Sequence, residues 1–147
     1  MSYFDAFAGF EQKSTAPLAT EFARLALSQG WKKGTKTWKN ERQACMQTEF
    51  AHHVAVDNRL ANWQSLCEEV GIAPTPESIT KCKKQLKKVH VNLVDLIDAR
   101  RAGTGKVRRF RNAKDLADYT RKSGKTFPKV KAKDDGYISI LLRHVWN

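Results

Sequence analysis

The chain has 147 residues, 41% of them hydrophobic, and a formal net charge of +12 at pH 7 that gives a sequence pI near 9.9. This length favours one compact domain with a single core, and the many aromatic residues argue against an intrinsically disordered chain. No run approaches the roughly 20 apolar residues of a membrane-spanning helix. Residues 1–30 also lack the basic start and apolar stretch of a secretory signal.

The positive charge is unevenly distributed along the chain. Residues 1–73 contain 8 Lys or Arg and 8 Asp or Glu, whereas residues 74–147 contain 19 and 7. We therefore describe a single domain, residues 1–147, as a neutral, aromatic-rich half followed by a basic half. A segregated surplus of this size makes a polyanion the leading candidate partner.

The neutral half is predicted to form an N-terminal arm and three helices. Phe4, Phe7 and Phe10 recur every three residues, which indicates one or two turns that hold the arm to the body through their rings. Apolar residues at helical spacing then predict three helices, over residues 17–29, 36–53 and 60–70.

Turn and capping residues mark the ends of these helices. Ser14 or Thr15 offers a hydroxyl that can cap the first helix, and Pro17 suits an early helical position. Gly30 and Gly71 follow the first and third helices, where a left-handed residue is favoured. These positions therefore predict a break after the first and third helices, whereas residues 54–58 either separate the second helix from the third or continue the helix.

The basic half is predicted to open with an amphipathic helix over residues 76–88. Pro74 and Pro76 forbid helix before it, and Thr75 is expected to cap it. On a helical wheel its apolar residues gather on one side and its lysines on the other. A helix face that only confers solubility usually mixes charge signs, so this face is a candidate anion-binding surface, the alternative being a solvated face. Its lysines are Lys81, Lys83, Lys84, Lys87 and Lys88.

A central helix is predicted after a short extended link at residues 89–91. Asn92 is expected to cap this helix, which carries Leu93, Leu96 and Ile97. The helix is expected to end at an arginine pair that suits its dipole and is also a candidate for anion binding, namely Arg100 and Arg101.

Residues 106–111 form a second candidate binding segment. Four cations alternate there with Val107 and Phe110, a mixture that nucleic-acid-binding arms use. The alternative is an edge segment whose two apolar residues face the core while its cations face water. The cations are Lys106, Arg108, Arg109 and Arg111.

Two further helices complete the predicted fold. One runs from an Asn112 cap to Gly124, and the last begins at Asp134. The sequence thus predicts a mostly α domain of about six or seven helices, with extended segments near residues 89–91 and 106–110.

A resemblance covers most of the chain. Residues shared with a group of short uncharacterised fungal proteins are Pro17, Glu21-Phe22, Arg24-Leu25, Gly30-Trp31, Gly34, Lys36, Trp38, Trp63-Gln64, Leu66-Cys67, Val70-Gly71-Ile72 and Cys82-Lys83-Lys84. The chain therefore resembles this group, and the resemblance implies no activity. Residues 78–101 are also similar to the helix-extended-helix modules of the SAP kind, which implies DNA binding, although the link at 89–91 is shorter than in that family.

No catalytic or metal-binding signature is evident in the sequence. Cys45, Cys67 and Cys82 are widely spaced and are read as reduced, buried thiols of an intracellular protein. The pair His52-His53 is read as solvent-facing, without the close spacing of metal ligands. Asp95 and Asp98 are read as helix-surface acids rather than nuclease carboxylates, so we predict no catalytic residue, no cofactor and no small-molecule substrate.

The sequence therefore predicts a nucleic-acid-binding protein that prefers duplex DNA to RNA and resides in the nucleus. The alternative is a protein-interaction module in which the aromatic residues of the neutral half, including Trp31 and Trp38, are partly exposed. A membrane surface is disfavoured because the apolar face of the helix at 76–88 is small.

Overall fold

The computed structural model describes residues 1–128, 140 and 141. Its elements are η1, a 3₁₀ helix (Tyr3–Ala6), and the α-helices α1 (Leu18–Gln29), α2 (Lys36–His53), α3 (Leu60–Glu69), α4 (Ile79–Leu86), α5 (Leu93–Ala102) and α6 (Ala113–Ser123). Within these residues the predicted mostly helical fold is confirmed. The helix predicted from Asp134 lies outside the described residues except for Ile140 and Leu141, which are helical and buried.

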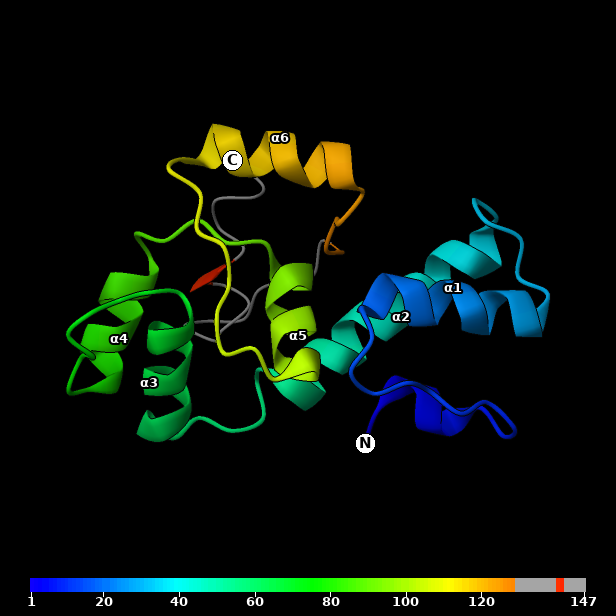
Figure 1. The fold of residues 1–147 in the computed structure, drawn as a ribbon, viewed down its shortest axis with the longest axis horizontal. Helices are drawn as coiled ribbons and strands as arrows, with labels where there is room; N and C mark the ends of the chain where they lie inside the picture. The colour runs from blue at the N-terminus through cyan, green and yellow to red at the C-terminus, as the bar shows by residue number, and fades with distance from the viewer. Residues whose placement is uncertain (129–139, 142–147) are drawn as a thin grey trace.

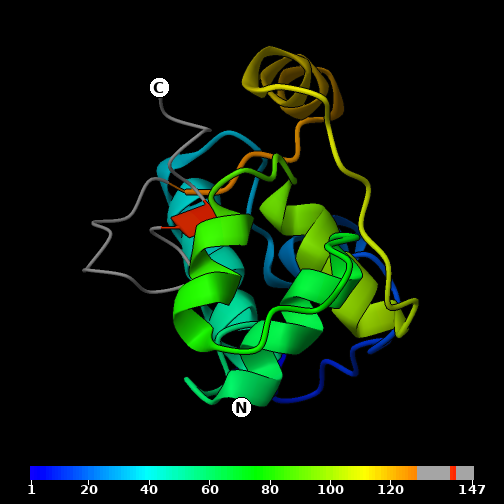
Figure 2. The ribbon, with the colours of Figure 1, turned by 90° about the vertical axis from the view of Figure 1, so that its left-hand side faces the viewer.

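The helices are arranged around α5 (Figure 1). Helix α2 packs against α5 and η1, and α1 packs against α2 and α5. Helices α3 and α4 form a close pair at the other end of the molecule. Helix α6 lies across the top of α5, reached by a long yellow segment that Figure 2 shows from the side.

A single core joins residues of both halves of the chain. Trp63, Phe50, Leu25 and Leu96 are among its fully buried members. Complete burial of a side chain of this kind contributes about 1.5–3 kcal/mol before the entropy of folding is counted. Because η1, α1, α2, α3 and α5 all contribute, neither half has a separate core.

The three cysteines are fully buried and unbridged, as predicted. Burial, together with the neighbouring Cys82 thiol, raises the pKa of the Cys67 thiol to about 12. Burial also raises the pKa of Cys45. These two thiols are therefore protonated near neutral pH, and they act as small apolar side chains.

The start of α1 differs from the prediction. Neither Ser14 nor Thr15 caps the helix, and the N-cap residue Pro17 has no side-chain acceptor that could do so. Instead, the Asp98 carboxylate on α5 accepts a hydrogen bond from the Leu18 amide at 2.8 Å. A distant acid thus supplies the cap, which local sequence cannot indicate.

Helix α4 is shorter than predicted. Ser78 rather than Thr75 is its cap, because the Ser78 hydroxyl accepts from the Lys81 amide, and the helix begins at Ile79. The Thr75 hydroxyl donates to Glu68 instead. The caps predicted at Asn92 and Asn112 are confirmed, since their side chains accept from the amides three residues on.

An antiparallel bridge joins His90 to Phe110. The Phe110 amide donates to the His90 carbonyl at 2.8 Å, and the Val107 amide donates to the Glu69 carbonyl at the end of α3 at 3.0 Å. The two segments predicted to be extended therefore meet. This pairing brings the end of α4 next to residues 106–111.

Candidate nucleic-acid interface

The first part of the candidate interface is the outer side of α4 and the turn that follows it. The predicted apolar side is confirmed, since Cys82, Leu86 and Val89 are buried. Lysines are exposed on the other side, at positions 81, 84, 87 and 88, with Lys87 and Lys88 lying beyond the end of the helix. The exposed lysines of α4 and of the turn after it therefore point away from the core.

Two lysines of α4 have partners on the protein. Lys83 is half-buried, with its Nζ 5.3 Å from the centre of the buried Trp63 ring. Lys81 Nζ lies 3.9 Å from a Glu77 carboxylate oxygen, and both side chains are well exposed. Exposed pairs of this kind contribute about 0–1 kcal/mol, so Lys81 can exchange its partner readily. Lys83 is the least available of the predicted lysines.

The second part of the interface is the segment 106–111. Its cations are exposed, while Val107 is half-buried and Phe110 is buried. Val107 and Phe110 are three residues apart and Arg108 and Arg109 are both exposed, so the segment does not follow the strict alternation of a strand, and its one bridge, to His90, is at Phe110. The segment is thus an edge segment in its packing, and it presents Lys106, Arg108, Arg109 and Arg111 outward.

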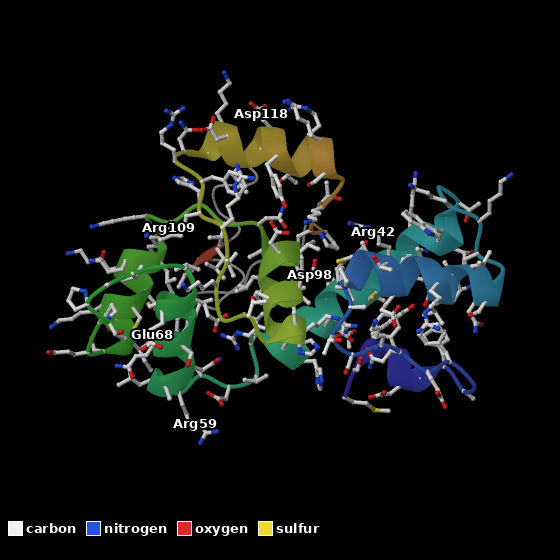
Figure 3. All side chains as sticks on the ribbon, viewed as in Figure 1. Arg42, Arg59, Glu68, Asp98, Arg109 and Asp118 are labelled. Atoms are coloured by element: carbon white, nitrogen blue, oxygen red, sulfur yellow. The ribbon has the colours of Figure 1, made fainter. Side chains whose placement is uncertain are left out.

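The three arginines of this segment are held in place by neighbouring groups. The Arg108 guanidinium lies 4.5 Å from the centre of the Phe110 ring. Arg109 donates to the Gly71 carbonyl at 3.3 Å, and Arg111 pairs with Asp115 at 3.3 Å. Figure 3 labels Arg109 on this segment, below Asp118 of α6. Partly ordered arginines lose less freedom when they bind an anion.

A groove of about 600 Å³ runs between this segment and α6. Its cationic lining includes Lys122, which is not among the predicted binding residues. Lys114 and Arg121 are also exposed on α6. These residues were missed because Asp115 and Asp118 alternate with them in sequence and make the helix look balanced. Their position beside residues 108–111 comes only from the tertiary structure.

We define the basic face as the exposed predicted cations of the two segments that the His90 to Phe110 bridge connects, namely α4 with the turn after it and residues 106–111. These are Lys81, Lys84, Lys87, Lys88, Lys106, Arg108, Arg109 and Arg111.

Arg101, which was predicted to bind a polyanion from the surface, is buried and does not belong to the basic face. Its side chain is 1% exposed and lies 3.5 Å from the buried carboxylate of Glu49. Its guanidinium also donates to the Ala16 and Lys13 carbonyls and to the Gln12 side chain. A buried cation with four internal acceptors is not accessible to a polyanion, and its removal would leave the Glu49 carboxylate buried without its cation.

Arg100 is also occupied by internal partners. Its Nε donates to Glu69 at 2.7 Å and its Nη1 to the His53 carbonyl at 2.9 Å, with 19% of the side chain exposed. The bond to Glu69 ties α5 to the end of α3. Arg100 is therefore a structural cation, and the prediction of a surface role for it is not supported by its position.

Glu49 is the centre of a buried polar cluster that attaches the N-terminal arm. It accepts from the Ser2 hydroxyl at 2.5 Å and from the Tyr3 amide at 2.8 Å, and it lies 2.9 Å from His53 Nε2. His53 is therefore turned inward, contrary to the prediction of a solvent-facing His pair, while His52 is exposed. The arm is held by these hydrogen bonds as well as by the buried ring of Phe4.

We expect the free energy of unfolding to fall in acid partly because of Glu49. Burial alone raises the pKa of this carboxyl, but hydrogen bonds from His53, Ser2 and Tyr3 outweigh it and lower the pKa to about 2. A carboxyl with a lowered native pKa adds stability above its ordinary value near 4.5 and loses it as the pH falls toward 2. The contribution is about 3 kcal/mol at neutral pH.

Urea denaturation between pH 7 and pH 2.5 measures this effect. Glu49→Gln should show a flatter pH dependence than the parent chain, whereas Glu77→Gln, at an exposed carboxylate, should show the parent's dependence. Equal slopes for Glu49→Gln and the parent would contradict the assignment to Glu49.

The acids on α5 are not surface acids, which corrects the prediction for them. Asp95 pairs with Lys125 at 2.7 Å, and Asp98 caps α1. Burial raises the pKa of Asp98. No group of three or more His, Cys, Asp or Glu in residues 1–128, 140 and 141 could hold a metal ion. Asp95 and Asp98 thus serve an ion pair and a helix end.

The fold and this site define a basic, mostly helical domain with the basic face on α4, the turn after it and the segment 106–111, and with further exposed cations on the adjoining side of α6. Comparisons with protein-family models, with curated proteins and with solved structures each find no match. None of the described helices is both long and apolar enough to cross a membrane.

Proposed function

We propose that the protein binds nucleic acid, duplex DNA in preference to RNA, through the basic face. The observation that carries the proposal is the bridge between His90 and Phe110, because it holds the link that follows α4 beside the segment 106–111, so that two exposed cationic segments separated by about twenty residues in sequence become neighbours. Contacts from this face would neutralise phosphates and release their counterions. The guanidinium groups of residues 108, 109 and 111 can each donate two hydrogen bonds to phosphate oxygens or to the edge of a guanine base.

The aromatic residues near the basic face favour a duplex over a single strand. Single-strand-binding proteins usually stack unpaired bases on exposed rings. Phe110 is buried here, and the half-buried Tyr119 ring has Arg108 on one side, with its hydroxyl accepting from Lys125 at 3.0 Å. Neither ring offers a free platform, so the recognition we propose is of the phosphate backbone.

The SAP-like resemblance supports this proposal only through α4. The order of α4, link and α5 agrees with that resemblance, but α5 is the central helix and most of its residues are buried. It cannot enter a DNA groove. Helix α4 and the segment 106–111 are therefore the binding elements in our proposal. Nuclear residence is a further part of it, since the basic run at 106–111 is also of the kind that acts as an import signal.

Fluorescence anisotropy with labelled duplex DNA, single-stranded DNA and duplex RNA tests the proposal. If six or more cations contact phosphates, affinity should fall about a thousandfold or more between 50 and 200 mM salt. We expect the duplex DNA to bind most tightly. Absence of binding at about 50 mM salt, or binding insensitive to salt, would contradict a phosphate-binding face.

A further inference from the structure

A second groove lies between α1, α2 and residues 123–128, at the end of the molecule away from α4 (Figure 1). Its volume is about 830 Å³, larger than that of the groove beside α6. Most of its lining is apolar and includes the side chains of Phe22, Trp31, Trp38, Met46 and Phe127. Leu27 at its edge is 84% exposed. The basic face does not extend to this groove.

The rim of this groove is strongly cationic. Residues 32–42 contain five of the eight Lys or Arg in the neutral half and a single acid, Glu41. Lys33, Lys39 and Arg42 line the groove. The four lysines of this stretch are exposed, and none of them forms an ion pair with another described residue.

The walls of the groove are fixed in place. Arg42 donates to the Thr126 carbonyl at 2.8 Å and to the Gly124 carbonyl at 3.4 Å, which ties α2 to the segment after α6. Trp38 and Trp31 each pack against the Phe22 ring, with centroids 5.6 and 6.2 Å apart. Glu41 accepts from the Tyr3 hydroxyl, so its charge is directed toward the arm. The groove is therefore preformed and has an excess of positive charge.

We propose that this groove binds an amphipathic helix of a partner protein, with acidic residues beside its apolar stripe. An apolar floor gains little from phosphates and sugars, but it matches side chains at positions i, i+3, i+4 and i+7 of a helix. Lys33 and Lys39 then face the partner's Asp or Glu residues, which gives the interaction charge complementarity. The exposed Leu27 side chain extends the apolar contact at the edge of the groove.

The direct test uses the full chain and a panel of labelled synthetic peptides of about 18 residues, long enough for five helical turns. Each peptide carries Leu, Phe or Met at the four stripe positions and Glu on both flanks. Paired peptides carry Lys in place of Glu. We expect anisotropy to report binding of at least one acidic peptide, and its Lys counterpart to bind about tenfold or more weakly.

Substitutions then locate the peptide site. Lys33→Glu with Lys39→Glu, and separately Leu27→Asp, should each weaken binding of the acidic peptide about tenfold or more, without unfolding the chain because all three side chains are exposed. The matched control, Lys84→Glu with Lys88→Glu, changes the same charge on the basic face and should leave peptide binding unchanged.

Three results would overturn the inference. The first is that no acidic peptide in the panel binds. The second is that the Lys33 and Lys39 variant and Leu27→Asp bind the peptide as the parent does. The third is that labelled duplex DNA loses its binding with the Lys33 and Lys39 variant while the acidic peptide does not, which would assign this rim to nucleic acid. The proposal for the basic face is judged separately, by DNA binding of the Lys84 and Lys88 variant.

Discussion

Replacing Arg101 by methionine should lower the free energy of unfolding by about 3–5 kcal/mol, because the change leaves a buried carboxylate without its cation. Arg101 is 1% exposed, and Glu49 beside it is fully buried. The same change removes the bonds to the Ala16 and Lys13 carbonyls, which hold the segment ahead of α1. Methionine retains much of the side-chain volume. The fall in the free energy of unfolding therefore reports the lost polar interactions rather than the creation of a cavity.

Urea denaturation followed by circular dichroism measures this loss. Arg121→Met is the matched control, since Arg121 pairs with Asp118 at 2.7 Å while its side chain is 71% exposed. That change should cost less than about 1 kcal/mol. The cost of Arg101→Lys should lie between these two values, because lysine keeps the positive charge but lacks the several fixed N–H donors of the guanidinium group. A cost below about 1 kcal/mol for Arg101→Met would show that the pair is not buried in solution.

Neutralising four cations of the basic face should reduce DNA affinity by two orders of magnitude or more at low salt. The variant carries Gln at Lys84, Lys88, Arg109 and Arg111, which are exposed. Removing one cation that binds a phosphate reduces the slope of log affinity against log salt by about 0.9, so the slope should fall by about four. Substituting exposed side chains leaves the core and the His90 to Phe110 bridge in place.

A second quadruple variant provides the control for total charge. It carries Gln at Lys32, Lys33, Lys36 and Lys39, which are also exposed, and Lys33 and Lys39 line the other groove. Both variants have four fewer positive charges than the parent, so a general effect of net charge would weaken DNA binding equally in the two. Retained binding in the control and abolished binding in the first variant would localise the interface, whereas equal weakening would contradict a defined face.

Much of the fold could be predicted because its signals are local. Helix ends at Gly30 and Gly124 follow from glycines with positive φ, of 75° and 71°. The side-chain oxygens of Asn92 and Asn112 cap helices by accepting from backbone amides three residues on. The apolar positions of α4 are spaced as one buried face requires. Each of these features depends on residues within one or two helical turns, and a sequence shows such neighbours directly.

Predictions about individual charges were less successful because charge partners are distant in sequence. Arg101 is followed by no local acid, and a cation at a helix end suits the dipole, so no local pattern indicates that it binds residues 12–16. Asp98 caps a helix that begins eighty residues earlier. Lys122 joins the groove beside the basic face only because α6 folds back over residues 108–111.

The charge balance of the neutral half was misleading for the same reason. Its 8 acids and 8 cations cancel in sequence, but Glu21 and Glu49 are buried and bonded to internal partners. The lysines at 32–39 remain exposed, so this half has a more positive surface than its composition indicates. An average over 73 residues could not separate buried from exposed charges.

The helices, their apolar faces and the overall excess of positive charge follow from spacing, caps and composition, which act locally or as sums. Which charges are accessible to a partner follows only from the packed structure. Their accessibility depends on burial and on ion pairs between residues such as Arg101 and Glu49, which only the packing of α5 against α2 brings together.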